Sequence, residues 1–240
     1  MNENINIADI KQKMFDKLKP SGWDKVFKHY IFSNEFIDSL LKLYKFAGEG
    51  KRFTPPLKNI FRAFEECPYD ELKVVIIGQD PYPQFGVADG IAFSCSNNDK
   101  PQPSLKYIFD ELERQYAAFR TNDLLYDPLD LKRWSNQGIL MLNTALTCEI
   151  GKIGSHYDIW KTFTAYLLDH LNTNHTGLIY VFMGKKAEDW SDLINDKYNY
   201  KFTVNHPASA AYRGGKWDSK NLFVEINKLL NKNHNLKIIW

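Results

Sequence analysis

Residues 74–83, Val74-Val75-Ile76-Ile77-Gly78-Gln79-Asp80-Pro81-Tyr82-Pro83, join an apolar run to a polar segment that contains two prolines. The apolar run predicts a buried β-strand over 73–77. The polar segment predicts a loop at the carboxyl end of that strand, where open α/β sheets bind their ligands. Both prolines fix φ and disfavour helical backbone at the preceding residue, so we expect Asp80 and Tyr82 in an extended loop. The loop alone fits a site of chemistry or a plain Asx-turn or helix cap at Asp80.

The hydrophobic pattern on both sides of this stretch alternates between strands and helices. Further strands are predicted at 138–142, 177–182 and 201–204. Helices are predicted at 7–18, 21–32, 33–47, 54–64, 103–116, 156–171, 185–194 and 218–230. This alternation indicates an α/β protein with a mostly parallel four-stranded sheet. No linker divides the chain, so we expect a single domain over 1–240, with an N-terminal helical region at 1–50 and a core at 51–233.

Each predicted strand ends in a polar or glycine-bearing turn. The four turns are Gln79-Asp80, Asn143-Thr144, Gly184-Lys185 and Asn205-His206-Pro207. Right-handed crossovers place all the carboxyl ends of parallel strands at one edge of the sheet. The sequence therefore predicts that these turns converge on one cleft.

Composition limits the classes of function. The chain has 31 Lys and Arg against 29 Asp and Glu, for a net charge of +2, which neither requires nor excludes nucleic acid. Its cysteines, Cys67, Cys95 and Cys148, are odd in number and form no CxxC pair, which favours a reducing compartment and argues against a zinc site. The sequence shows neither a signal-peptide pattern nor an apolar run near the ~18 residues of a membrane span. We therefore expect a cytoplasmic protein that does not bind membranes.

Five motifs together resemble a known family. Residues 75–82 resemble the GQDPYH motif of family 1 uracil-DNA glycosylases, and Gly90-Ile-Ala-Phe-Ser94 resembles the GLAFS that follows it. Residues 103–105, 142–147 and 206–214 resemble the family's PSL, LNTVLTV and HPSPLSAYRG blocks, in the same order. The resemblance spans about residues 50–230. It implies a three-layer α/β/α fold, hydrolysis of the glycosidic bond of deoxyuridine in DNA, and no metal or other cofactor.

The resemblance also implies roles at the base. Phe93 would stack on an extruded uracil, and Asn143 would read its edge, because an amide offers the donors and acceptor that distinguish uracil from cytosine. Tyr82 would exclude the methyl group of thymine, and the Gln79 backbone would touch the base. Asp80 would stabilise the developing sugar cation and orient water, and a neutral His206 would donate a hydrogen bond to the departing uracil oxygen.

Contacts to the DNA are less completely matched. The implied DNA-binding residues are Pro81, Ser104, Lys185, Ser209, Tyr212, Arg213 and Lys216. Pro83 stands where the family has His, so that hydrogen-bond donor is lost. The last motif is one residue short, lacks the Leu that fills the vacated base stack, and has Ala208 in place of a phosphate-binding Ser. Arg213, Lys216 and Trp217 could compensate through phosphate contacts and stacking.

Each of these residues also has an ordinary structural explanation, such as core packing for Phe93, chain turning for Asn143 and helix capping for His206. Two other functions stay open: a glycosylase of the same fold that acts on a modified base, as in phage DNA, and a DNA-binding accessory protein with weak or no turnover. The expected partner is uracil-containing DNA, single- or double-stranded. A protein inhibitor of such enzymes is a further candidate partner, and we expect a monomer.

Overall fold

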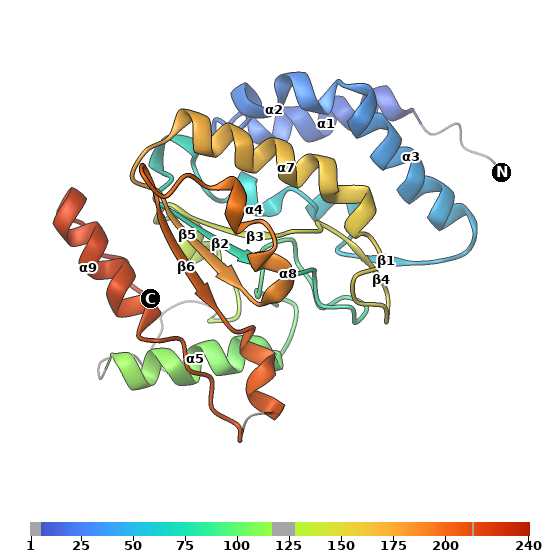
Figure 1. Ribbon diagram of the computed structural model, residues 1–240. Coiled ribbons are helices and arrows are strands. Elements are labelled where there is room, and N and C mark those ends of the chain that lie inside the picture. The colour runs from blue at the N-terminus through green and yellow to red at the C-terminus, as the bar shows by residue number, and fades with distance from the viewer. Residues whose placement is uncertain (1–5, 117–127, 213) are drawn as a thin grey trace.

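The computed structural model describes residues 6–116, 128–212 and 214–240, and its centre is a parallel sheet (Figure 1). The strand order is β3-β2-β5-β6, and every neighbouring pair is parallel. The strands are β2 (Val74–Gly78), β3 (Ile139–Asn143), β5 (Ile179–Met183) and β6 (Tyr200–Val204). The predicted four-stranded α/β sheet is therefore confirmed, and it is parallel throughout.

Helices cover both faces of this sheet (Figure 1). One layer contains α7 (Tyr157–Asn174), with α1 (Ile7–Leu18), α2 (Asp24–Ile31) and α3 (Asn34–Gly48) beside it, and α3 packs on α7. The opposite layer contains α5 (Pro103–Gln115) and α9 (Leu222–His234), which contact each other. The three-layer α/β/α arrangement agrees with the expectation from the family resemblance.

Local sequence accounts for the main elements. Every residue of β2 and of β5 is buried, as expected for central parallel strands covered on both faces. The Asn6 side chain accepts hydrogen bonds from the backbone at the start of α1, and Ser33 does the same at the start of α3. Beneath α7, aromatic rings pack edge-to-face, including Phe64 against Phe27 and against Phe163. The sheet edge that bears the cleft is thus held by a well-packed core.

Two predicted helices are broken. In place of one helix over 54–64, the chain forms η1 (Leu57–Asn59) and α4 (Arg62–Glu65), and the loop at Gly90 packs so closely that a Cβ there would lie 2.0 Å from the Asn59 carbonyl oxygen. In place of one helix over 185–194, the chain forms α8 (Lys185–Glu188) and η4 (Ser191–Leu193), because Trp190 between them packs against the core. Both predictions were wrong because tertiary contacts interrupt the helical pattern.

Several short elements had no clear signal in the sequence. The strands β1 (Phe53–Thr54) and β4 (Cys148–Glu149) form a small antiparallel sheet, and β4 leads into the segment that reaches Asp80. The other short elements are η2 (Tyr69–Glu71), α6 (Lys132–Ser135) and η5 (Pro207–Tyr212). Elements of two to six residues carry too little periodicity to be recognised.

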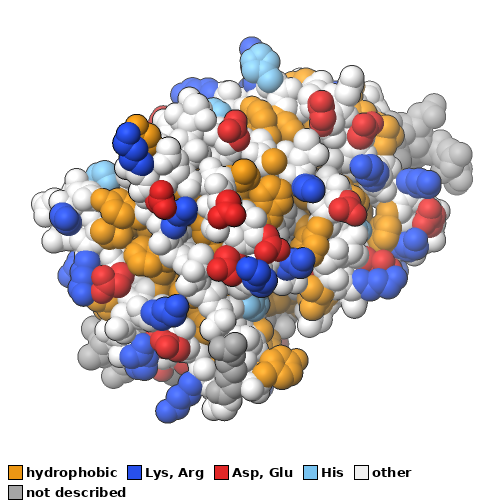
Figure 2. All heavy atoms as spheres, viewed as in Figure 1, with side chains coloured by type: hydrophobic (Ala, Val, Ile, Leu, Met, Phe, Trp, Pro, Cys, Tyr) orange, Lys and Arg blue, Asp and Glu red, His pale blue; other side chains and the backbone are white. Residues whose placement is uncertain are grey.

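The surface carries both signs of charge. Figure 2 shows Lys and Arg interspersed with Asp and Glu over the visible face, consistent with the net charge of +2. Within the described residues, no helix has the length and apolar character that crossing a membrane requires. The division into a helical region at 1–50 and a core at 51–233 stays a prediction.

Candidate active site

The sheet register brings the key strand ends together. Gly78 at the end of β2 pairs with Asn143 at the end of β3, so Gln79 and Asp80 leave the sheet beside Asn143. On the other side of β2, the Gly184 backbone N–H donates to the Val204 carbonyl at the end of β6. The turns after all four strands therefore lie at one edge of the sheet, as predicted. Those after β2, β3 and β6 line one cavity, whereas Gly184 and Lys185, after β5, do not line it.

These strand ends surround a cavity of about 240 Å³. This volume is below the ~300–1,000 Å³ of sites for drug-sized ligands, so the cavity suits a group the size of one nucleobase. The predicted residues that line it are Gln79, Asp80, Pro81, Tyr82, Phe93, Ser104, Asn143 and His206. The lining also includes Ala88, Leu146, Ile153 and Ala208, which the sequence analysis did not assign to the base pocket.

Phe93 forms one wall of the cavity and is held in unusual backbone geometry. Its φ is 65°, in the left-handed region, where a residue with a bulky side chain costs about 1–3 kcal/mol. The Tyr82 hydroxyl donates to the Phe93 carbonyl at 3.0 Å, and the ring centroids of Phe93 and His206 are 5.8 Å apart. The surrounding contacts thus keep the Phe93 ring facing the same space as His206.

Asp80 is partly buried beside a loop that is distant in sequence. The Gly154 backbone N–H donates to Asp80 Oδ2 at 2.5 Å. Burial raises the pKa of Asp80, and the hydrogen bonds from Gly154 and Gln79 oppose that rise. The Tyr157 ring lies against Gly154, where an added Cβ would be 3.0 Å from Tyr157 Cε2. Burial, and after it the charge of Asp80, raises the pKa of the Tyr157 phenol. No local sequence pattern indicates this hydrogen bond, which joins residues 74 positions apart in the chain.

His206 is held as a neutral hydrogen-bond donor. Burial lowers the pKa of His206, so the neutral imidazole dominates at neutral pH. Its Nδ1 accepts a hydrogen bond from the Ala208 backbone N–H at 3.2 Å, which leaves the proton of the neutral ring on Nε2. Gly184 lies against it, because a Cβ there would be 2.8 Å from His206 Cβ. This arrangement leaves an N–H donor on the ring nitrogen away from the backbone.

Asn143 sits beside Phe93 with its amide available. A Cβ built on Gly78 would lie 2.6 Å from Asn143 Oδ1 and 3.1 Å from Phe93 Cζ. Gly78 is therefore required for the close approach of both side chains. Among the residues that the structure describes, the Asn143 amide makes no hydrogen bond within the protein, so its donors and acceptor can meet a ligand in the cavity.

The other predicted DNA-binding residues lie outside the cavity. Lys185 begins α8 directly after Gly184, and its side chain is 79% exposed and 3.4 Å from Glu188. Ser209 and Tyr212 lie on η5, which follows His206, and Tyr212 is 93% exposed. Lys216 lines a separate hollow beside α5. Arg213 lies outside the described residues.

Trp217 does not fit the compensating role that the sequence suggested. Its side chain is buried, and its Nε1 donates to the Asn205 carbonyl at 2.8 Å. A ring committed to the core and to a backbone carbonyl cannot stack on DNA. Its place in the core also anchors the turn that precedes His206.

Metal ligation has no support in the part of the chain that the structure describes. No group of three or more His, Cys, Asp or Glu side chains among these residues could hold a metal ion. Cys67, Cys95 and Cys148 are buried free thiols. The residues that line the cavity supply carboxylate, amide and imidazole groups, which are suited to hydrolysis and to hydrogen-bond recognition.

Comparison with known proteins agrees with this geometry. Residues 64–231 match the family model of the uracil DNA glycosylase superfamily. The uracil-DNA glycosylase of Dichelobacter nodosus is 34% identical over 220 residues, covering 91% of this chain and 93% of that protein. That of Francisella tularensis is 37% identical over 196 residues, covering 81% of this chain and 86% of that protein.

A solved structure shows the same likeness in three dimensions. The crystal structure of mimivirus uracil-DNA glycosylase superposes with a TM-score of 0.81 at 26% identity, covering 94% of this chain and 88% of that one. The family model spans all four strands of the parallel sheet and all the strand ends that line the cavity. This chain belongs to the uracil-DNA glycosylase superfamily.

Proposed function

We propose that this protein hydrolyses the N-glycosidic bond of deoxyuridine in DNA, which releases free uracil and leaves an abasic site. The observation that carries the proposal is that Asp80 and His206 line one cavity of about 240 Å³ from different strand ends. The glycosidic bond cannot be reached inside a duplex, so the nucleotide must be extruded into such a pocket. A carboxylate and an imidazole that line the same nucleobase-sized cavity support this proposal.

Recognition of uracil falls to three residues. The extruded ring stacks on Phe93, and the Asn143 amide donates to one uracil carbonyl and accepts from the imide N–H. Cytosine presents a mismatched pattern, and each buried group left unpaired costs about 1–3 kcal/mol. Tyr82 stands at the ring carbon that carries thymine's methyl group and rejects thymine by overlap. The hydrogen bond from its hydroxyl to the Phe93 backbone carbonyl supports this role by holding the Tyr82 side chain against the segment that carries Phe93.

Cleavage of the bond separates charge, and Asp80 and His206 meet the two charges. The bond between C1′ and N1 breaks with its electron pair leaving on uracil, so positive charge grows on the sugar. Ionised Asp80 stabilises that cation and orients the water that attacks C1′. The His206 Nε2–H donates to the uracil oxygen where negative charge gathers, and Gln79 contributes its backbone at the base. As the new C1′–O bond forms, the water gives a proton to the Asp80 carboxylate, which returns it to solvent, and the released uracil anion takes up a proton from solvent.

We assign the contacts with the DNA strand to residues both inside and outside the cavity. Lys185, Ser209, Lys216 and the Ser104 hydroxyl at the start of α5 contact phosphates, with Pro81 shaping the loop beneath and Arg213 as a further cation. The family's Leu has no counterpart here, and the exposed ring of Tyr212 supports a substitute role. We assign Tyr212 to the vacated base stack, where an aromatic ring stacks on the neighbouring bases.

The expected partners follow from the proposed function. Uracil-containing DNA is the substrate, single- or double-stranded, and we propose that the protein acts as a monomer in the cytoplasm. A protein inhibitor is a further proposed partner; two mimivirus variants were solved in complex with UGI, at 27% and 28% identity to this chain. No metal or organic cofactor enters the mechanism.

The experiment that tests this function measures base release. The protein is incubated with a single-stranded oligonucleotide that carries one deoxyuridine, and free uracil and alkali-labile strand breaks are quantified. Matched oligonucleotides carry thymine, cytosine or a modified pyrimidine at that position. We expect release of uracil alone. Release of only the modified base would favour the modified-base glycosylase, and binding without any release would favour the accessory protein.

A further inference from the structure

The loop over residues 88–96 builds one wall of the base pocket. Ala88, Gly90, Ile91, Phe93 and Ser94 all line the cavity. Phe93 has a left-handed backbone at φ 65°, a conformation that persists only where neighbouring contacts fix it. The source of that constraint lies beneath the loop.

Asp89 organises the loop from inside. Its side chain is 2% exposed. Its carboxylate accepts hydrogen bonds from the backbone N–H groups of Ile91 at 3.1 Å and Ser96 at 3.0 Å, and from the Ser94 hydroxyl at 2.6 Å. These contacts span Phe93 on both sides in sequence. A buried carboxylate is tolerated only with a counter-charge and hydrogen bonds, so the loop depends on the cation that faces Asp89.

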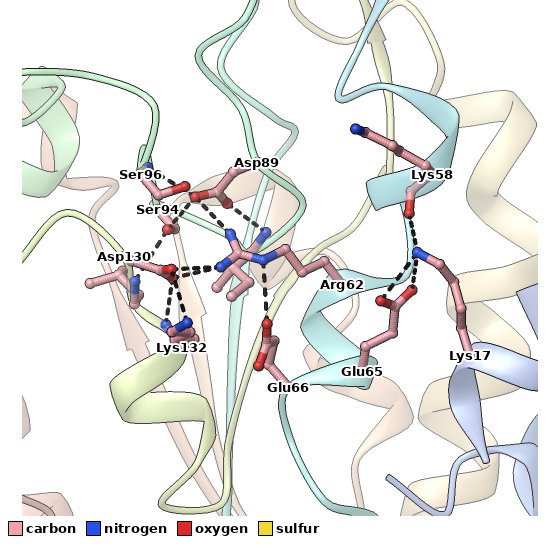
Figure 3. Close-up of polar contacts among 12 residues, drawn as sticks. Lys17, Lys58, Arg62, Glu65, Glu66, Asp89, Ser94, Ser96, Asp130 and Lys132 are labelled. Atoms are coloured by element: carbon pink, nitrogen blue, oxygen red, sulfur yellow. Dashed lines mark hydrogen bonds and ion pairs between the residues drawn. The ribbon is translucent and has the colours of Figure 1, made fainter. Parts of the chain in front are cut away.

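That cation is Arg62, from α4 (Figure 3). Its Nη1 lies 3.0 Å from Asp89 Oδ2, and its Nη2 donates to the two oxygens of Asp130 at 2.8 and 2.7 Å. Its Nε is 3.6 Å from Glu66, and the side chain is only 15% exposed. One guanidinium therefore ties α4, the 88–96 loop and the segment before α6 into a single network.

The backbone of the 88–96 loop also packs against Arg62. Gly90 has φ +103°, and a Cβ there would lie 2.9 Å from Arg62 Cβ, so the loop rests directly on the arginine stem. The Ala92 backbone N–H donates to the Met141 carbonyl of β3 at 3.1 Å, which fixes the far side of the loop. Phe93 thus lies between a strand and a buried ion pair, and these contacts fix the backbone of the loop that carries it.

We propose that Arg62 and Asp89 are positioning residues for uracil recognition, whose buried ion pair fixes the 88–96 loop and holds the Phe93 ring where the base stacks. The inference rests on the proposed role of Phe93 in base stacking. Neither residue touches the substrate. Loss of the pair loosens the aromatic wall, which weakens binding of the base and leaves the grip on the DNA backbone intact.

The test separates base binding from DNA binding. Free uracil, the reaction product, is titrated as an inhibitor of uracil release to give its Ki. Affinity for a single-stranded oligonucleotide with an abasic site, which has no base to stack, is measured by fluorescence anisotropy. Arg62→Met should raise the uracil Ki and the substrate KM by about tenfold while abasic-site affinity changes by less than about twofold. For Arg62→Lys we expect a uracil Ki and a substrate KM between those of wild type and Arg62→Met, because lysine keeps the positive charge but lacks the several N–H donors of the guanidinium.

The matched control is Lys17→Met. Lys17 pairs with Glu65 on the same short helix at 3.4 Å, and both are drawn in Figure 3, away from the loop. This variant should leave both binding constants unchanged. Thermal melting establishes that each variant is folded; if Arg62→Met does not fold, Asp89→Asn is measured in its place with the same expectation.

Two outcomes would overturn the proposal. A folded variant whose uracil Ki stays within about twofold of wild type would show that the ion pair does not position the pocket. Equal weakening of uracil and abasic-site binding would show a general structural role. Phe93→Ala in the same assay separates the positioning role of the ion pair from the stacking role of Phe93. If Phe93→Ala raises the uracil Ki and Arg62→Met does not, only the positioning role is refuted. If Phe93→Ala has no effect on the uracil Ki, the stacking role is refuted as well.

Discussion

Gly78→Ala should disturb the base pocket directly, because its added methyl group would clash with two residues that line the cavity. The added methyl group would lie 2.6 Å from Asn143 Oδ1, and 3.1 and 3.2 Å from two ring atoms of Phe93. Ordinary contacts of such atoms are about 3.5–4.0 Å, so the Asn143 amide must retreat by roughly 1 Å. Gly78 has no left-handed φ, so the substitution adds no backbone strain. The variant therefore disturbs at once both side chains that we propose contact uracil.

The expected loss follows from hydrogen-bond geometry. A displacement of about 1 Å lowers the rate on the order of 100-fold, which corresponds to about 2.7 kcal/mol less stabilisation of the transition state. Overpacking of the buried strand end should also lower stability by about 1–3 kcal/mol, or roughly 2–12 °C in Tm. The assay is single-turnover release of uracil from a single-stranded oligonucleotide at saturating enzyme, with a thermal melt of each variant. Saturation separates the chemical step from weaker binding.

The control is Gly48→Ala, at the end of α3. Nothing lies within 4 Å of a Cβ at that position, and its backbone is not left-handed. This variant should release uracil at the wild-type rate. If Gly78→Ala is folded and also releases uracil at the wild-type rate, then Asn143 and Phe93 do not read the base from the positions described.

Three further predictions concern specificity, DNA contact and pH. Asn143→Asp should admit cytosine, because a carboxylate accepts from the exocyclic amino group, and loss of uracil release with no release of cytosine would contradict this. Tyr212→Ala should lower kcat/KM on double-stranded DNA by about tenfold or more and on single-stranded DNA by less, since only a duplex has a stack to refill; Tyr198→Ala, another exposed tyrosine, is the control. Burial lowers the pKa of His156 to about 4, below its unfolded value of ~6.5. The contribution of neutral His156 to the free energy of unfolding is therefore complete above pH ~6.5, and we expect that free energy to fall by about 2–3 kcal/mol as the pH drops toward 4. Urea melts of wild type and His156→Gln measure this, and an equally steep decline in the variant would assign it to other groups.

The sheet and the convergence of its strand ends were predictable because their signals are local. The apolar runs at β2, β3 and β5 are long enough to be recognised, and parallel topology then places Asp80, Asn143 and His206 at one edge. The resemblance to the family added Phe93, whose place in the pocket no periodicity would suggest. The structure brings all four to one cavity.

Other parts depend on contacts between segments that are distant in sequence. The ion pair between Arg62 and Asp89 and the hydrogen bond from Gly154 to Asp80 join such segments. Their residue types are common on protein surfaces, so nothing in the sequence distinguishes them. Trp217 illustrates the converse, since its place among basic residues suggested stacking on DNA and its ring is instead part of the core.

We propose that the Asp80 carboxylate acts in the chemical step and does not contribute to DNA binding. Single-turnover uracil release by Asp80→Asn, measured beside its affinity for abasic-site DNA, tests it most directly. Asparagine keeps the shape and can still accept from the Gly154 N–H, so only the charge is lost. We expect Asp80→Asn to release uracil at a rate at least about 100-fold below wild type, with its DNA affinity nearly unchanged. A rate within a few-fold of wild type would contradict it.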